Sequence, residues 1–193
     1  EEDLYTISAL HKSMRNRDVD AAVYWCSRMM DGGEDPLYIA RRLVRFASED
    51  IGLADTNAFR VAINTFQACQ FLGMPECDVH LTECVIYLAA APKSNAAYKA
   101  RQEAHAAIKK TGNLPVPLQI RNAPTKLMKE LHYGQGYQYA HDTKDKLTNM
   151  TTMPPELEGA HFYHPGDQGF EPRFKARLAQ IAAWHRKHPS KNE

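Results

Sequence analysis

Residues 35–45 read Asp-Pro-Leu-Tyr-Ile-Ala-Arg-Arg-Leu-Val-Arg, and this stretch carries the signals of an amphipathic helix. The aspartate offers a side-chain acceptor to the free amides of a first helical turn, and the proline that follows has no amide hydrogen to leave unpaired. Leu37, Ala40 and Leu43 recur at helical spacing, so they are expected to face a core. The stretch therefore predicts a helix that begins at Pro36, buries one stripe and places its arginines off that stripe.

Similar start and stop signals flank this stretch on both sides. Capping residues and glycines predict five more helices in the first 112 residues, and these helices begin near Leu4, Asp18, Asp55, Pro75 and Ser94. Helices of about four turns joined by short links favour antiparallel neighbours. No alternating strand pattern competes with them. We therefore predict an all-α fold, a multi-helix bundle.

The prolines divide the chain into two parts. Only three of the eleven lie in the first 112 residues, and the remaining eight lie between Pro115 and Pro189. Proline forbids long helices and pushes the preceding residue into an extended conformation. We therefore expect a helical bundle core over 1–112. Residues 113–193 are predicted to form a proline-rich wrap of the same domain, with an extended stretch at 114–118, a short helix around 125–131 and a C-terminal helix over 172–185.

Composition excludes several classes of protein. The 193 residues are 44% hydrophobic and 24% charged with a net charge of +1, which is typical of a soluble globular chain and gives no bulk attraction to nucleic acid or a membrane. The longest apolar run, 84–91, is too short to span a bilayer. The acidic start lacks the pattern of a secretion signal. Four unevenly spaced cysteines favour reduced thiols in a cytosolic or nuclear compartment.

Motifs for catalysis are missing from the sequence. There is no Gly-Lys dipeptide and hence no phosphate-binding loop, and neither a Gly-x-Ser-x-Gly elbow nor a His-Glu-x-x-His motif occurs. We therefore do not expect an enzyme. Cys77, His80 and Cys84 share one helix face and suit zinc, but a fourth ligand is not nearby. The alternative is that Cys84 fills the core while Cys77 and His80 lie at an exposed helix start.

Two surfaces are candidates for binding. Arg41, Arg42 and Arg45 lie within five positions, which fits either a solvated helix face or a protein interface where arginine pairs with carboxylates. Asp50 and Asp55 border the end of the same helix and are the expected partners.

The second candidate surface is basic and aromatic. Arg121, Lys126 and Lys129 are followed by Tyr133 and Tyr137, and such residues together can hold a nucleic-acid strand through phosphate contacts and base stacking. The alternative is that the tyrosines pack a tight loop while the lysines are solvated.

Several runs of this sequence resemble one known family closely. They are residues 20–25, 33–45, 47–55, 91–95 and 114–129. The resemblance is to the C-terminal domain of the MgsA/RarA family of AAA+ ATPases, the replication-associated recombination proteins, whose eukaryotic counterpart is the Werner-helicase-interacting protein. It implies a fold like the clamp-loader C-terminal collar. It also implies that an N-terminal ATPase core, with its ATP and magnesium, lies outside this chain, so that no cofactor is expected here.

The resemblance further implies an oligomerisation domain of a DNA-dependent ATPase that acts at replication forks. Its partners would be itself, as a homotetramer, and single-strand-binding protein and DNA through the full-length protein, in the bacterial cytoplasm at the nucleoid and away from membranes. Members usually carry Gly-Tyr-Gly-Lys-Gly-Tyr where this chain has Gln135 in place of the lysine, which weakens any phosphate-binding role for that loop.

The function predicted is therefore self-association. The interface is expected to include the three arginines and two aspartates named above together with Asn122 and Pro124. The alternative function is a DNA-binding module that uses residues 121–139.

Overall fold

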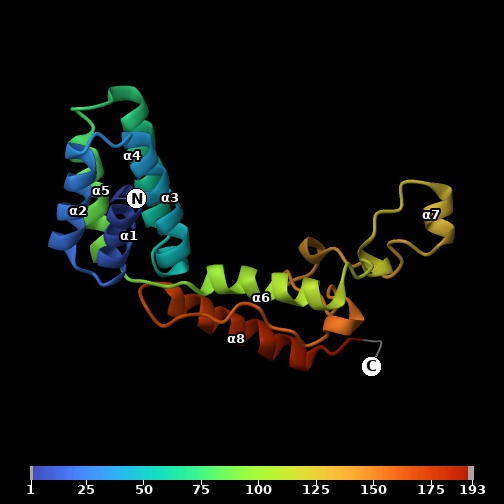
Figure 1. Cartoon of the computed structure of the whole chain (residues 1–193). Helices are drawn as coiled ribbons and strands as arrows, with labels where there is room; N and C mark the ends of the chain where they lie inside the picture. Colours follow the sequence, from blue (N-terminus) through green and yellow to red (C-terminus); the bar gives the residue numbers. More distant parts are fainter. Residues whose placement is uncertain (1, 191–193) are drawn as a thin grey trace. The chain divides into compact units, whose positions relative to one another are not determined.

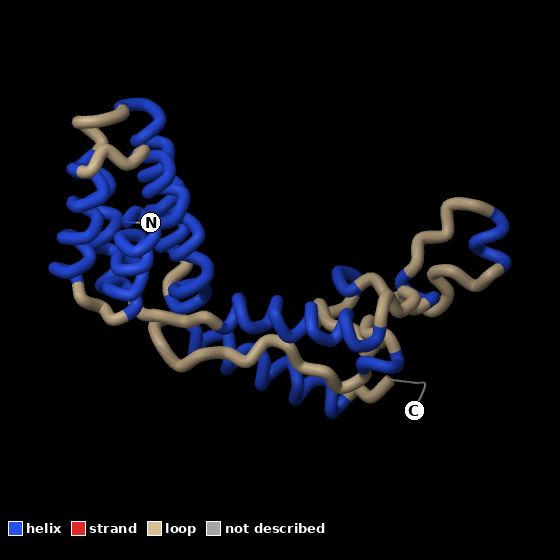
Figure 2. The backbone as a smooth tube through the Cα atoms, viewed as in Figure 1, coloured by secondary structure: helices blue, strands red, loops and turns tan. Residues whose placement is uncertain are grey.

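A computed structural model describes residues 2–190 of the chain, and these residues are helical wherever they form regular structure (Figure 2). The longer helices are α1 (Glu2–Arg15), α2 (Val19–Asp31), α3 (Pro36–Phe46), α4 (Asn57–Leu72), α5 (Asp78–Ala90), α6 (Ala96–Thr111), α7 (Lys126–Glu130) and α8 (Glu171–Lys187). The short ones are η1 (Ala47–Ile51), η2 (Gly52–Ala54), η3 (Leu118–Ile120), η4 (Ala140–Asp142) and η5 (Pro155–Leu157). Over the described residues the all-α prediction is confirmed. No helix among them is long and apolar enough to cross a membrane.

The chain forms two compact units. The first unit comprises the residues up to Gln102 together with Tyr163–Lys175, and the second comprises Glu103–Phe162 with the residues from Ala176 onward. The chain thus leaves the first unit, forms most of the second, and returns. The expected organisation of one domain into residues 1–112 and 113–193 stays a prediction.

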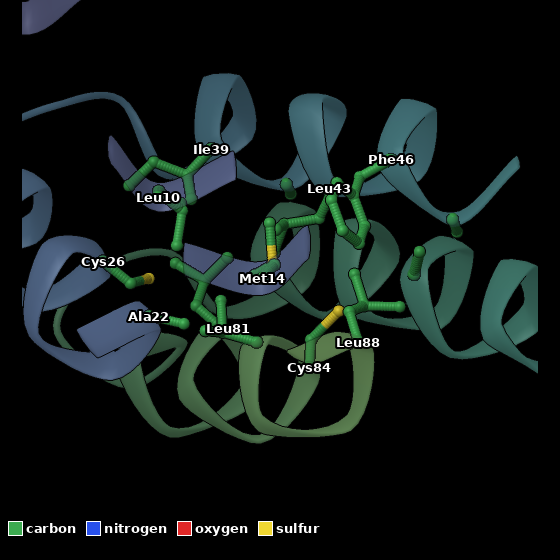
Figure 3. Packing of buried hydrophobic residues seen from close by; sticks show 14 of the residues in the cluster. Leu10, Met14, Ala22, Cys26, Ile39, Leu43, Phe46, Leu81, Cys84 and Leu88 are labelled. Atoms are coloured by element: carbon green, nitrogen blue, oxygen red, sulfur yellow. The ribbon is translucent and has the colours of Figure 1, made fainter. Parts of the chain in front are cut away.

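Helices α1 to α5 of the first unit enclose the hydrophobic core (Figure 1). Figure 3 shows Leu10 and Met14 of α1 facing Leu43 of α3 and Leu81 of α5, and all four side chains are fully buried. Burying a side chain of this size contributes roughly 1.5–3 kcal/mol. The stripe predicted on α3 is confirmed, because Ala40 and Leu43 are buried and Leu37 packs against the core.

The predicted helix caps are present. Asp18 accepts a hydrogen bond from the Ala21 amide at 3.0 Å, and Asp35 accepts one from the Leu37 amide at 2.9 Å. At its other end α3 continues as the π-helical turn η1 up to Gly52, whose φ of 49° is the left-handed conformation that glycine adopts without strain.

The start of the fifth helix differs from the prediction. Pro75 was expected to open it, but α5 begins at Asp78. The intervening residues form a turn, in which the Cys77 amide donates to the Gly73 carbonyl at 2.9 Å and the Asp78 amide donates to the Pro75 carbonyl at 3.1 Å. The turn folds the Cys77 side chain inward, so the expectation that this thiol is exposed is wrong.

Residues 163–175, here called the strap, bring the chain back to the first unit. The Phe170 amide donates to the Ala54 carbonyl at 2.8 Å, and the Tyr163 hydroxyl donates to Oε2 of the fully buried Glu171 at 2.7 Å. A Cβ at Gly169 would overlap the Ala54 carbonyl oxygen. Only glycine therefore allows the strap to lie this close to the η2 backbone.

The second unit contains a segment, here called the arm, over residues 114–139. Its backbone is fixed from within: Arg121 Nε donates to the Val116 carbonyl at 2.6 Å, and the Gly134 amide donates to the Leu118 carbonyl at 2.7 Å. The Arg121 guanidinium also lies over the Tyr133 ring, 4.8 Å from its centroid. The arm is therefore held in shape by polar and cation–π contacts.

The second unit shows no core. Of its described residues, 103–162 and 176–190, none is buried. The arm alone exposes six large apolar side chains: Val116, Leu118, Leu127, Leu131, Tyr137 and Tyr139.

Candidate assembly surfaces

The arginines of α3 have neighbours within their own chain. Arg45 Nε pairs with Glu49 at 3.0 Å, one turn along, and its guanidinium lies 5.9 Å from the Tyr98 ring centroid. Arg41 lies over Tyr38, at 5.6 Å from the ring centroid. Both arginines are exposed, so these contacts leave much of their surface open to a partner.

Arg42 lies on the inner side of the same helix, beside a histidine. Its Nη2 is 3.4 Å from Nδ1 of His11, a buried residue whose ring stacks on Phe46. Burial, with the positive charges of Arg42 and Arg15 nearby, lowers the pKa of His11 to about 4. This histidine is therefore neutral at physiological pH, and sequence reasoning did not single it out.

The two aspartates expected to pair with these arginines have other partners. Asp50 Oδ1 accepts from Arg15 Nε of α1 at 2.8 Å, because η1 turns this carboxylate toward α1. Asp55 accepts from the Tyr87 hydroxyl of α5 at 2.6 Å and from the Asn57 amide at 3.0 Å. Both carboxylates thus connect helices of the first unit, and the structure does not bring them to the α3 arginines.

The remaining predicted residues lie on the arm. Asn122 and Pro124 are exposed in the loop before α7. Lys126 and Lys129 are exposed on α7 itself, whose first turn is capped by Thr125 through the Met128 amide at 3.2 Å. Gln135 lines a polar cavity of about 280 Å³ with Gln119, Gln138 and Asn149.

An apolar and acidic surface at one end of the first unit escaped the sequence analysis. It is the connection between α4 and α5, residues 71–79, here called the tip (Figure 1). Phe71 is 83% exposed and Val79 59%, and Leu72 and Met74 are also exposed. Glu76 and Asp78 are exposed beside them. The sequence signal that could have revealed it is the run from residue 61 to 92, which contains no lysine or arginine.

The cysteines and histidines do not gather into a metal site in the described part of the chain. Within residues 2–190 no group of three or more metal-binding side chains comes together. Burial raises the pKa of Cys84 to about 11 and that of Cys26 to about 12, which keeps both thiols protonated. The zinc hypothesis for Cys77, His80 and Cys84 therefore has no geometric support here.

These features define a class of protein: an all-α domain with a conventional core in one unit and exposed, oppositely charged surfaces on its arm and tip. Residues 16–182 match the family described as MgsA AAA+ ATPase C terminal, and the chain belongs to this family.

Similar proteins come from bacteria and from a eukaryote. The chain is 47% identical over 183 residues to replication-associated recombination protein A of Coxiella burnetii, and 43% identical over 186 residues to the protein of the same name in Escherichia coli strain K12. The alignments cover 94% and 96% of this chain but 42% of each relative. ATPase WRNIP1 of Dictyostelium discoideum is 46% identical over 159 residues, covering 81% of this chain and 18% of that protein. The chain thus spans less than half the length of these relatives.

Proposed function

We propose that this chain is the self-association domain of a AAA+ ATPase that acts in DNA replication and recombination, and that four copies assemble through it. The membership in a family of ATPase C-terminal domains supports the ATPase part of the proposal. The names of the relatives support the role in replication and recombination.

The main support for self-association is the exposure of the second unit. A chain segment that orders itself loses conformational entropy, and burial of apolar surface is the main term that offsets this loss. None of the described residues of the second unit is buried, although large apolar side chains are frequent there. Contact with another protein surface would supply the missing burial. A second copy of the chain is the partner that is always present.

The rest of the proposal concerns the whole protein. ATP and magnesium would bind outside this chain, so the chain alone would have no ATPase activity. Single-strand-binding protein and DNA would be partners of the complete protein, which would work in the bacterial cytoplasm at the nucleoid.

Multi-angle light scattering of the purified chain tests the proposal. At tens of micromolar we expect a mass near four times the 21.9 kDa of one chain. A mass of one chain over that concentration range would contradict self-association.

A second candidate function is DNA binding by the arm, favoured by the exposed Lys126 and Lys129 on α7. Against it, the Arg121 guanidinium lies over the Tyr133 ring, so a base that stacked on that face of the ring would have to displace it. Fluorescence anisotropy with a labelled single strand at several salt concentrations tests this candidate. Binding that weakens steeply with salt and is lost in Lys126→Ala/Lys129→Ala would support it, whereas no salt dependence would exclude it.

A further inference from the structure

The arm and the tip carry opposite charge on apolar surfaces. The arm, residues 114–139, has three basic residues and one acidic residue, Glu130, whereas the tip, residues 71–79, has two acidic residues and no basic one. The same contrast extends to the whole units. The first unit has 13 basic against 16 acidic residues, a net charge of −3, and the second has 11 against 7, a net charge of +4.

The arm presents its apolar and basic groups together. Leu127 and Leu131 are one helical turn apart at the α7 end, 64% and 49% exposed, and Lys126 and Lys129 lie beside them. The cap at Thr125 and the bonds of Arg121 set the arrangement of these groups, and burial against a partner would supply the apolar contact that the arm lacks within its own chain.

The tip presents the matching groups. Its exposed Phe71 and Val79 offer apolar area, and Glu76 and Asp78 offer two carboxylates between them in sequence. The tip is also fixed from within, because its turn is closed by backbone hydrogen bonds and Cys77 Sγ lies 3.5 Å from Met74 Sδ beneath it.

We propose that the arm of one copy docks on the α4–α5 tip of a second copy, with Leu127 and Leu131 against Phe71 and Val79 and the α7 lysines facing Glu76 and Asp78. This inference rests on the proposed self-association and names the surfaces that carry it. Contacts between two different patches run head to tail, and they form a closed ring when the rotation between copies closes. Charge complementarity of this kind fixes partner and orientation.

Charge reversal tests the pairing. We expect Lys126→Glu/Lys129→Glu, the arm variant, and Glu76→Lys/Asp78→Lys, the tip variant, each to raise the concentration at which the assembly half-dissociates by at least about tenfold, since like charges then face each other. An equimolar mixture of the two variants should restore the four-copy mass, because every contact in an alternating ring again pairs opposite charges. Analytical ultracentrifugation measures both effects.

Two control variants separate charge pairing from other effects. Lys99→Glu/Arg101→Glu reverses two exposed charges on α6, outside the arm. Asp20→Lys puts a positive charge in the first turn of α2, as Asp78→Lys does in α5, and so has the same unfavourable interaction with the helix dipole. Both controls should assemble as the unmodified chain does. Circular dichroism should show unchanged helix content in all variants.

The outcomes separate the two proposals. A monomeric unmodified chain would overturn both. A four-copy unmodified chain whose arm and tip variants also assemble normally would overturn the arm–tip contact and leave self-association standing. Variants that lose assembly but are not restored by mixing would likewise overturn the pairing. Loss of DNA binding in the arm variant with assembly intact would assign the arm to nucleic acid instead.

Discussion

The first unit and the second unit are built from helices joined by loops, yet they use their apolar residues in opposite ways. In the first unit, α1 to α5 turn theirs toward one another, and side chains such as Leu10 and Leu43 are fully buried. In the second unit Leu127 and Leu131 stay exposed, and the arm is held by hydrogen bonds and an arginine–tyrosine contact. If the chain self-associates as proposed, the first unit would be stable alone, whereas the second would gain stability from contact with a partner.

The strongest test of this contrast removes a leucine from each unit. Leu43→Ala should lower the free energy of unfolding by about 3 kcal/mol, because it leaves a cavity in the core. Leu127→Ala should change it by less than about 0.5 kcal/mol in the dissociated chain. Urea unfolding followed by circular dichroism measures both. Equal losses would show that the second unit has a core of its own.

Acid should weaken the first unit through His11. The pKa of its imidazole is about 4 in the folded chain, against an ordinary value of 6.5, with Arg42, Arg15 and Glu49 facing it. The unfolded chain therefore binds the proton first, and stability falls as the pH drops from 6.5 to 4, by up to about 3 kcal/mol. Thermal melts across this range should show the decline, and His11→Gln should make it shallower. An identical slope in the variant would contradict the assignment.

A matched pair of glycines tests the strap. Gly169 and Gly159 both have positive φ, of 58° and 78°, but only Gly169 is crowded, by the Ala54 carbonyl and Pro92. Gly169→Ala should lower the free energy of unfolding of the first unit by about 2 kcal/mol, since the strap must move away. Gly159→Ala, which lies in the second unit with open space around it, should leave the unfolding of the first unit unchanged. Differential scanning calorimetry compares the two.

The smallest expected difference concerns helix caps. Asp35→Ala removes the acceptor for the Leu37 amide and should destabilise the first unit by about 1 kcal/mol. Thr125→Ala removes the equivalent cap of α7 in the second unit and should leave the denaturant midpoint of the first unit unchanged. A shift of that midpoint in Thr125→Ala would mean that the two units unfold together.

Local signals made much of the fold predictable. Asp18 and Asp35 cap their helices as expected, Gly32 follows the end of α2, and Thr125 caps α7. The prediction failed where the signal was ambiguous. Pro75 fits a helix start, yet it lies in the turn that precedes α5, and the helix begins at Asp78.

Long-range contacts were beyond the reach of the sequence. The pairing of Asp50 with Arg15 depends on how η1 turns toward α1, and no local pattern encodes it. Glu171 is a residue type expected at an exposed helix start. It is buried beside Tyr163 only because the strap returns to the first unit. The exposure of Phe71 and Val79 likewise depends on how the turn between α4 and α5 closes.

Because of the strap, cleavage of the chain within the arm would not separate the molecule into two free pieces. The chain enters the second unit after Gln102 and re-enters the first at Tyr163, so the arm belongs to a loop anchored at both ends. A protease that cuts an exposed peptide bond in the arm would therefore produce two fragments, and both fragments would stay bound in the same molecule. The downstream fragment would remain attached through Phe170 and the buried Glu171. A nicked molecule would elute at its original size and reveal its two pieces only under denaturing conditions.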